Sequence, residues 1–473
     1  MLNFVAMESL FARHFGTAPE KVVPIAASGS NRRYFRISAG TFSAVAVQGT
    51  EAAENRAFIA FSEHFRKQGL PVPEIYEVSR DGLCYLQEDL GDVSLFSRLD
   101  DRQAVLRAVA LLPKVQVLGA RGLDFSLCWP LSAFDRRSVF FDLDYFKYCF
   151  LKPSGIDFDE NRLQDEFELL ADELLKSPAD YFMYRDFQSR NIMLRDGQPY
   201  LIDYQGGRKG PLEYDLASFV WQAKAAFPEA FREELVETYL EALSALVPVD
   251  RELFRRRLGF FVLFRTMQVL GCYGFRGLVE KKAHFISSIP FALDNLSAIL
   301  EGPSVEPFPY LARLLSELVR KRPGSAKCAE LPSETVPGVL YIDVMSFSYR
   351  KGIPDDLSGN GGGYVFDCRG MDNPGRYAEY RNLTGLDRPV IEFLEARAEV
   401  AKFLAHALPL VDAHAECFLE RGLSHLSVFF GCTGGQHRSV YCAEHAAAHL
   451  KEKFGDRIRV RLVHRERGME RIL

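Results

Sequence analysis

The stretch YRDFQSRNIMLRDGQPYLID, residues 184–203, decides how the larger part of the chain should fold. It contains Asp186, then Asn191 five residues later, an Asp-Gly turn between two short apolar runs, and Asp203 after the second run. Phosphoryl transfer requires a carboxylate beside the attacking hydroxyl and oxygen ligands for the Mg²⁺ ions on the phosphates. The spacing therefore predicts a kinase catalytic loop and hairpin, with Asp186 as the base and Asn191 and Asp203 as Mg²⁺ ligands.

The alternative is an ordinary polar loop whose Asp and Asn side chains cap turns. A second motif, GPLEYDLAS at residues 210–218, follows closely and favours the kinase loop. Together, YRDFQSRNIM, LIDYQ and GPLEYDLAS resemble the aminoglycoside phosphotransferase superfamily, and within it the bacterial anomeric kinases of N-acetylmuramate and N-acetylglucosamine. The resemblance implies a protein-kinase-like bilobal fold that transfers phosphate from ATP, with Mg²⁺, to a small amino sugar. Tyr184 departs from the family's usual His, which leaves open what supports the loop backbone.

Composition narrows the classes of protein that the chain can represent. Its 473 residues exceed a single core, so we expect a multidomain protein of α/β and α+β type. The 58 basic and 63 acidic residues give a net charge of −5, which excludes a generally polybasic nucleic-acid binder. The nine cysteines include no C-x-x-C pair, so neither a disulfide framework nor a zinc site is indicated, and a cytoplasmic location is expected. We expect no export signal and no membrane span.

The nucleotide site is expected in an N-terminal lobe at about residues 1–91. The run PIAASGSNRRYFRIS, residues 24–38, reads as two strand edges around a small-residue turn, which either covers nucleotide phosphates or forms a plain hairpin. A kinase strand normally follows that ends in a phosphate-binding Lys, but this chain has Gln48 there. Arg32 or Arg33 is the candidate replacement. The predicted ATP-binding residues are Ser28, Gly29, Ser30, Asn31, Arg32 and Arg33 in the loop, and Gln87, Glu88 and Leu90 in the hinge beside adenine.

Two alternatives remain open for this part of the chain. The hinge segment also reads as an edge strand that ends at Gly91. Because Gln48 and Tyr184 depart from the kinase pattern, a non-catalytic adaptor that only binds nucleotide is the rival of an active kinase.

A mostly helical C-terminal lobe at about residues 92–320 would complete a kinase domain of residues 1–320 and carry the acceptor site. Its most apolar segment, residues 258–275, is interrupted by Arg265 and Gln268 one turn apart, which are either buried supports or acceptor contacts. Residues 321–337, rich in Pro and Ser, read as a linker.

Residues 338–473 alternate strand-like and helix-like runs and should form a separate α/β domain. The motif GCTGGQHRS, residues 431–439, links an apolar strand to the start of a helix, where free N–H groups and the helix dipole favour an anion. A glycine turn with a helix-capping Ser is the alternative. The predicted anion-binding residues are Cys432, Thr433, Gly434, Gly435, His437, Arg438 and Ser439.

The segments SFSYRKGIP, YVFDCRG, LTGLDRPV and GCTGGQHRSV are similar to the RapZ C-terminal domain, with Gln436 in place of that family's Lys. The resemblance implies reversible binding of an amino-sugar phosphate, and it raises RNA as a further partner. Cys432 and Arg438 also have the C-x5-R spacing of protein tyrosine phosphatases, which makes a phosphatase the rival function of this domain.

The last part of the chain bears on the RNA alternative. Arg457, Arg459 and Arg461 alternate with apolar residues, so a strand here would bury one face and expose a basic ridge on the other. Such a ridge either contacts RNA phosphates or protects an edge strand against aggregation.

Overall fold

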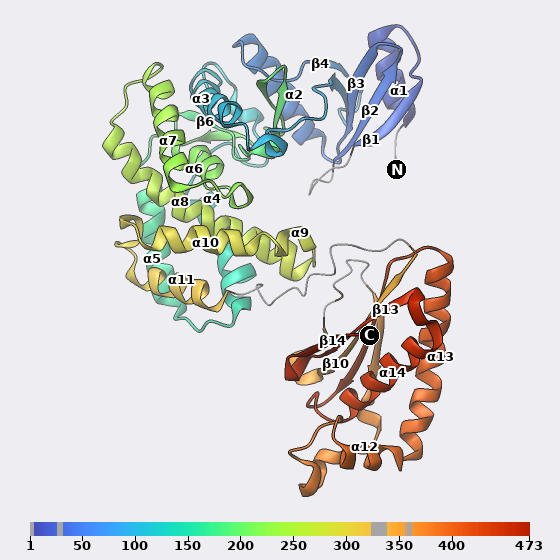
Figure 1. Ribbon diagram of the computed structural model, residues 1–473. Coiled ribbons are helices and arrows are strands. Elements are labelled where there is room, and N and C mark those ends of the chain that lie inside the picture. The colour runs from blue at the N-terminus through green and yellow to red at the C-terminus, as the bar shows by residue number, and fades with distance from the viewer. Residues whose placement is uncertain (1–3, 26–31, 323–337, 355, 357–361) are drawn as a thin grey trace. The chain divides into compact units, whose positions relative to one another are not determined.

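The structure is a computed structural model that describes residues 4–25, 32–322, 338–354, 356 and 362–473. The chain divides near residue 326 into two compact units, and each has its own sheet and hydrophobic core (Figure 1). The first unit combines an antiparallel sheet with a helical lobe, and the second is an α/β unit with a mainly parallel sheet. The predicted multidomain fold class is therefore confirmed. Most of the predicted linker lies outside the described residues.

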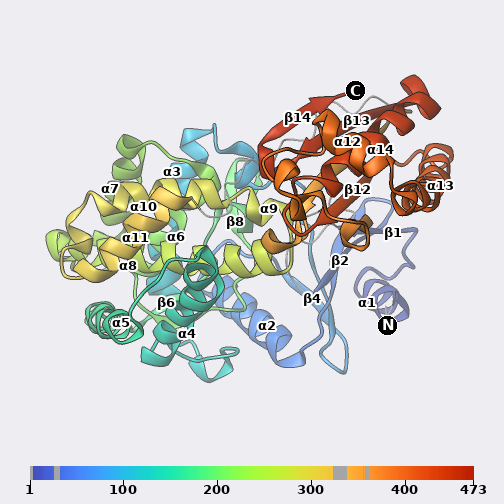
Figure 2. The same cartoon turned by 90° about the horizontal axis from the view of Figure 1, so that it is seen from below.

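The N-terminal lobe is a five-stranded antiparallel sheet in the order β1-β2-β3-β5-β4. Alternate side chains of a strand point to opposite faces, and here each face is buried under a helix. Ala44 and Ala46 pack toward helix α1, whereas Val45 and Val47 pack toward helix α2, and Figure 2 shows the two helices on opposite sides of the strands. The elements are α1 (Phe4–Phe15), β1 (Lys21–Ile25), β2 (Arg33–Ala39), β3 (Phe42–Gln48), α2 (Ala52–Lys67), β4 (Ile75–Val78) and β5 (Cys84–Glu88).

The second lobe is mostly helical, and α8 is its central element. Helices α4, α6 and α10 all pack against α8. Over residues 251–279 this helical stretch is long and apolar enough to cross a membrane, with a mean hydropathy of 1.3, but 67% of it is buried, as in a core helix. The helices are α3 (Arg102–Leu118), α4 (Arg136–Phe146), α5 (Glu160–Leu175), α6 (Glu213–Val220), α7 (Glu229–Ser244), α8 (Arg251–Tyr273), α9 (Ala283–Ile286), α10 (Ile289–Leu300) and α11 (Pro309–Lys321).

Two short ribbons carry the segment that decided the sequence analysis. Strand β6 (Tyr181–Met183) pairs with β9 (Arg208–Gly210), and β7 (Ile192–Arg195) pairs with β8 (Gln198–Leu201). The predicted turn between β7 and β8 is confirmed, because Asp196 and Gly197 both have positive φ, 50° and 71°. Two successive residues of this kind form the tight hairpin turn that matches the strand twist. The hairpin therefore fixes the separation of Asn191 and Asp203 at its two ends.

The C-terminal unit has the strand order β11-β12-β10-β13-β14, in which β14 alone is antiparallel to its neighbour among the described strands. Helix α14 packs against β10, β12 and β13, so the predicted strand, loop and helix around residues 431–439 are present. The long helical run after residue 387 is two helices. The elements are β10 (Leu340–Ser348), β11 (Gly363–Asp367), α12 (Arg388–Glu395), α13 (Ala398–Glu420), β12 (His425–Cys432), α14 (Arg438–Phe454), β13 (Ile458–His464) and β14 (Met469–Ile472).

The predicted basic ridge on the last strands is wrong. Strand β13 lies inside the sheet between β10 and β14, so it is not an edge strand. Arg461 is buried and its Nε lies 2.7 Å from Asp343 Oδ1, while Arg457 precedes the strand and Arg459 is exposed. The prediction failed because it did not include β14, whose pairing places the strand in the interior.

Candidate active site

Asp215, a fully buried residue of the GPLEYDLAS motif, fixes the backbone of the predicted catalytic loop. Its Oδ2 accepts a hydrogen bond from the Tyr184 backbone N–H and its Oδ1 one from the Arg185 N–H, both at 2.7 Å. Gln116 Nε2 also donates to Oδ2, at 3.1 Å. Burial raises the pKa of Asp215 to about 7, although these hydrogen bonds favour the ionised form. One carboxylate therefore fixes the backbone just before Asp186.

Tyr184, which replaces the family's His, supplies a second support. Its hydroxyl donates to the carbonyl of Ile202, the residue before Asp203. The ring is fully buried and lies edge-on to Phe187 and Tyr204. The loop that carries Asp186 and the strand end that carries Asp203 are thereby tied together, so this departure does not leave the loop without support.

The three predicted catalytic residues come together. Asn191 Nδ2 donates to the Asp186 carbonyl oxygen at 2.8 Å, which orients the amide oxygen of Asn191 the other way. Burial raises the pKa of Asp203, and the negative charge of Asp186 raises it further. Gln205 Nε2 holds Asp203 Oδ1 at 2.8 Å. Two neighbouring carboxylates next to an amide oxygen form a donor set that suits a divalent cation.

No group of three or more His, Cys, Asp or Glu side chains suited to a metal occurs among the described residues. The set above does not conflict with this observation, because it has two carboxylates and takes its remaining oxygen from an amide. The residues present therefore fit a cation that also draws ligands from a bound phosphate, as Mg²⁺ does.

A cavity of about 320 Å³ lies between the two lobes of the first unit, beside Asn191 and Asp203. Val45, Met193 and Ile202 give it apolar walls, which suit a flat base. Gln87 Oε1 is buried and has no hydrogen-bond partner among the described residues, so it is available to a donor on a ligand. The predicted residues that line the cavity are Arg32, Gln87, Glu88, Leu90, Asn191 and Asp203. Ser28, Gly29, Ser30 and Asn31 lie outside the described residues.

The structure distinguishes the two candidate arginines. Arg32 is buried in the cavity wall, and its guanidinium lies 3.3 Å from Glu54 of α2. Arg33 is exposed and does not line the cavity, and on β3 the residue opposite it is Gln48. The cation paired with the helix Glu is thus the residue just before β2, and β3 carries an uncharged side chain where kinases have Lys.

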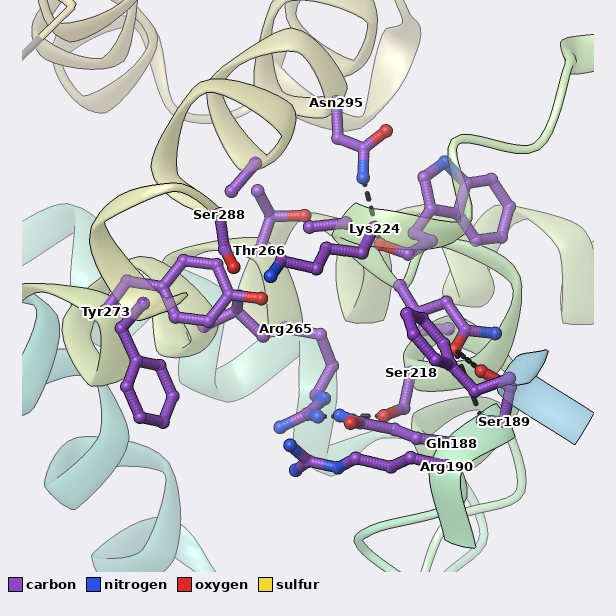
Figure 3. Close-up of a pocket in the computed structure, with 18 of the residues that line it drawn as sticks. Gln188, Ser189, Arg190, Ser218, Lys224, Arg265, Thr266, Tyr273, Ser288 and Asn295 are labelled. Carbon is purple, nitrogen blue, oxygen red and sulfur yellow. Dashed lines mark hydrogen bonds between the residues drawn. The ribbon is translucent and has the colours of Figure 1, made fainter. Parts of the chain in front are cut away.

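A second cavity of about 280 Å³ lies on the other side of the catalytic loop (Figure 3). Gln188, Ser189 and Arg190 of the loop line it, together with residues that follow α6 and residues of α8 and α10. Arg190 lines both cavities. Residues of one short loop therefore line both cavities.

Arg265, predicted as either a buried support or an acceptor contact, is a buried support that also lines the second cavity. Its two terminal nitrogens donate to Ser218 Oγ and to the Tyr214 hydroxyl, each at 2.8 Å. It also donates to Gln268 Oε1 at 2.6 Å. The GPLEYDLAS motif thus connects the loop clamp, Asp215, with the wall of the acceptor cavity.

Sequence reasoning missed three residues of this site. Asp215 was quoted within its motif without a role, because only the fold brings it under the loop. Gln222 accepts hydrogen bonds from the Ser189 N–H at 3.2 Å and from the Ser189 hydroxyl at 2.5 Å. Lys224 lines the second cavity from a short 3-10 turn whose sequence has no periodic pattern. No sequence pattern marks Gln222 or Lys224 as part of the site.

In the C-terminal unit, the predicted anion loop uses its N–H groups internally. Cys432 is buried, and its Sγ accepts from the Gly435 N–H at 3.2 Å and lies 3.1 Å from Ser439 Oγ. Burial alone would raise the pKa of the Cys432 thiol, but hydrogen bonds from Ser439, Gln436 and Gly435 outweigh it and lower that pKa below its usual value. The sulfur therefore occupies the position that the loop offers to an anion.

The cationic side chains of this loop face away from it. His437 Nε2 lies 2.9 Å from the Tyr380 carbonyl oxygen, and Arg438 donates to the carbonyls of Arg369 and Met371 at 3.1 and 2.9 Å. Thr433 and Gly434 are exposed. His437 and Arg438 are therefore engaged with backbone carbonyls of other segments, and the anion site and its phosphatase alternative stay predictions.

Comparison with known proteins gives matches to both units. Residues 21–253 match the model of the phosphotransferase enzyme family, and residues 340–468 match that of the RapZ C-terminal domain. A nucleotide-binding protein of Glaesserella parasuis is 34% identical over 184 residues, which are 38% of this chain and 62% of that protein. One of Alkalilimnicola ehrlichii is 41% identical over 152 residues, 32% of this chain and 46% of that protein. The chain thus covers less than two thirds of the length of either relative.

Among solved structures, a choline kinase from Cryptosporidium parvum aligns with a TM-score of 0.47 at 12% identity, over 66% of this chain and 100% of that one. A thermostable mutant of the aminoglycoside phosphotransferase APH(4)-Ia aligns with a TM-score of 0.40 at 17% identity, over 67% and 100%. Successive parts of the chain thus match the phosphotransferase family model and the RapZ C-terminal domain model.

Proposed function

We propose that residues 1–320 form an ATP-dependent kinase that phosphorylates an N-acetylated amino sugar at its anomeric hydroxyl. One observation carries the kinase proposal: residues 188–191 of a single loop line two cavities, with Gln188 and Ser189 on one side and Asn191 on the other. Arg190 of this loop lines both cavities, so a donor and an acceptor bound in them would meet at the loop that also carries Asp186. The amino-sugar acceptor rests on the resemblance of residues 184–218 to anomeric sugar kinases.

Each residue of the site has a role in this proposal. Asp186 accepts the proton of the attacking hydroxyl, and the Asp215 clamp holds it in position for this. Asn191 and Asp203 would hold Mg²⁺, which when bound neutralises charge on the nucleotide phosphates. Arg32 faces the same cavity and supplies the positive charge that the missing Lys would provide. The Gln87 amide and the apolar walls receive the base.

The test is ATP consumption by the full chain over a panel of acceptors: N-acetylglucosamine, N-acetylmuramate, glucosamine and an aminoglycoside. We expect an N-acetylated sugar to stimulate turnover, and Asp186→Asn to lower kcat at least ~10²-fold, because general-base catalysis is typically worth that much. Asp180→Asn is the matched control, because Asp180 carries an exposed carboxylate and lies directly before strand β6. An unchanged kcat in Asp186→Asn would refute the base assignment.

The same panel of acceptors also distinguishes an active kinase from the non-catalytic adaptor. If calorimetry detects ATP binding that requires Asp203 but no acceptor stimulates turnover, the first unit is a nucleotide-binding module without kinase activity. Stimulation by the aminoglycoside alone would keep the kinase and replace the amino sugar.

For the C-terminal unit we propose reversible binding of an amino-sugar phosphate, and the observation behind it is the match of residues 340–468 to the RapZ C-terminal domain. Thr433 and Gly434, the exposed members of the loop, are the first contacts to test. Calorimetry of the full chain with glucosamine-6-phosphate should detect binding that Thr433→Ala weakens and Cys432→Ser preserves. Phosphate release that depends on Cys432 would indicate the phosphatase, and retention of structured RNA without sugar binding would indicate the adaptor.

A further inference from the structure

The second cavity is positively charged. Arg190, Lys224 and Arg265 line it, and none of the described residues that line it is Asp or Glu. A site for a cationic acceptor would need carboxylates, because a buried or half-buried cation is costly without an opposite charge. The cavity therefore disfavours an aminoglycoside or a free amine.

Carboxylates outside the cavity offset two of its charges in part: Asp203 interacts with Arg190, and Asp142 and Asp215 interact with Arg265. Within the part of the chain that the structure describes, neither Lys224 nor Arg190 forms a hydrogen bond or an ion pair, and the hydrogen-bond partners of Arg265 are all uncharged. Burial lowers the pKa of His284, another lining residue, and the positive charges of Lys224, Lys282 and Arg190 lower it further. Neighbouring groups thus experience a net positive field.

Lys224 is held in place by the fold. It lies on the 3-10 turn η6 (Ala223–Ala225), directly after Gln222, whose side chain is bonded to Ser189 of the catalytic loop. Asn295 Nδ2 of α10 donates to the Trp221 carbonyl at 2.9 Å, which also fixes the residue before Gln222. In the view of Figure 3 the Lys224 side chain runs across the cavity toward Ser288 and Thr266.

The positive charge has a competing explanation, which is that it serves the transferred phosphate. Arg190 lines both cavities and fits that explanation. Lys224 lines the acceptor cavity and not the nucleotide cavity, so the donor phosphates do not account for it. Its ammonium, which has no hydrogen-bond or ion-pair partner among the described residues, lines the second cavity from an anchored turn.

We infer that the acceptor carries an anionic oxygen group besides the hydroxyl that is phosphorylated, and that Lys224 is the residue that selects for it. The inference rests on the proposed kinase function and narrows its substrate class to sugars with a carboxylate or a phosphate. Arg190 and Arg265 add to the field, whereas Lys224 contacts the group through charge-assisted hydrogen bonds.

The test uses acceptors that differ in charge on the same sugar. N-acetylmuramate is N-acetylglucosamine with a carboxylate-bearing ether, and N-acetylglucosamine-6-phosphate carries a phosphate instead. We expect the full chain to prefer one anionic sugar over N-acetylglucosamine by at least about 10-fold in kcat/KM, and Lys224→Gln to remove about that factor for the anionic sugar alone. Added salt should weaken the binding of the anionic acceptor more than the binding of the neutral one.

Lys114→Gln is the matched control, because Lys114 is exposed on α3 and does not line the cavity. Binding is measured as well, by calorimetry with the Asp186→Asn variant, so that the inference does not depend on turnover. Anion-selective binding that Lys224→Gln abolishes, without turnover in the wild type, supports the inference and refutes the kinase. Equal affinity for charged and neutral sugars, tighter binding of the neutral sugar, or no binding of either anionic sugar overturns the inference.

Discussion

Replacement of Asp215 by Asn changes one atom under the catalytic loop and should disable the enzyme. The wild-type carboxylate accepts from two consecutive backbone N–H groups, those of Tyr184 and Arg185, with one oxygen each. An amide has a single acceptor oxygen, so its NH₂ group must face one of these donors. A buried N–H left without a partner costs about 1–3 kcal/mol. The loop can avoid this cost only by moving, and a shift of about 1 Å at a catalytic group lowers the rate about 10²-fold.

The assay is steady-state ATP turnover with the best acceptor, together with denaturant unfolding. We expect Asp215→Asn to lower kcat about 10²-fold while KM for ATP stays nearly constant, and to lower the free energy of unfolding by about 1–3 kcal/mol. Asp180→Asn removes a carboxylate whose side chain is 82% exposed, and it should leave both quantities almost unchanged. A folded Asp215→Asn variant with wild-type kcat would refute the clamp.

The pH gives this prediction a second readout. Burial raises the pKa of Asp215 from 3.8 to about 7, so the folded state binds this proton more tightly than the unfolded state does. The stability that this group contributes is fully present below pH 3.8 and is lost as the pH rises through about 7. The kcat should change in the opposite direction, because protonation removes an acceptor from the clamp as the pH falls below 7. In Asp215→Asn, both the free energy of unfolding and kcat should depend less on pH in this range. A wild-type kcat that is constant there would contradict a role for the Asp215 carboxylate in the clamp.

Two further variants test the nucleotide cavity and the second sheet. Arg32→Gln should raise KM for ATP about 10-fold, because it removes a charge-assisted contact to the phosphates, whereas Arg33→Gln should not, and steady-state kinetics distinguishes them. Asp343→Ala removes the buried partner of Arg461 and leaves it only the longer contact to Glu470, at 3.7 Å. It should lower the free energy of unfolding of the C-terminal unit by about 3–5 kcal/mol in a circular-dichroism titration, whereas Asp456→Ala, at a fully exposed carboxylate, should not.

The sequence was most informative where local spacing determines geometry. Asp186, Asn191 and Asp203 are joined by a short loop and a tight hairpin, so their proximity follows from chain connectivity. The strand, loop and helix around residues 431–439 follow from local pattern in the same way, as does the alternation that gives each unit its sheet. These features depend on contacts close in sequence, which periodicity and turn residues report.

The failures concern contacts that are distant in sequence. Arg32 and Arg33 are adjacent, and which of them faces the cavity depends on how β2 lies in the sheet, which the sequence does not state. Arg461 is buried because β14 covers its strand. His437 and Arg438 are directed by carbonyls of residues 369–380, more than 50 positions away. The direction of each of these side chains is set by contacts in the folded protein and not by the local sequence.

The separation of Lys224 from the catalytic loop has a consequence for how such an enzyme could diversify. The residues proposed for chemistry lie on the loop and its hairpin, whereas Lys224 lies on a three-residue turn that follows Gln222, the residue bonded to the loop. Replacement of that one lysine leaves Gln222 and the Asn295 anchor intact. Paralogues could therefore exchange charged for neutral acceptors through single substitutions in this turn, without first losing the ability to use ATP.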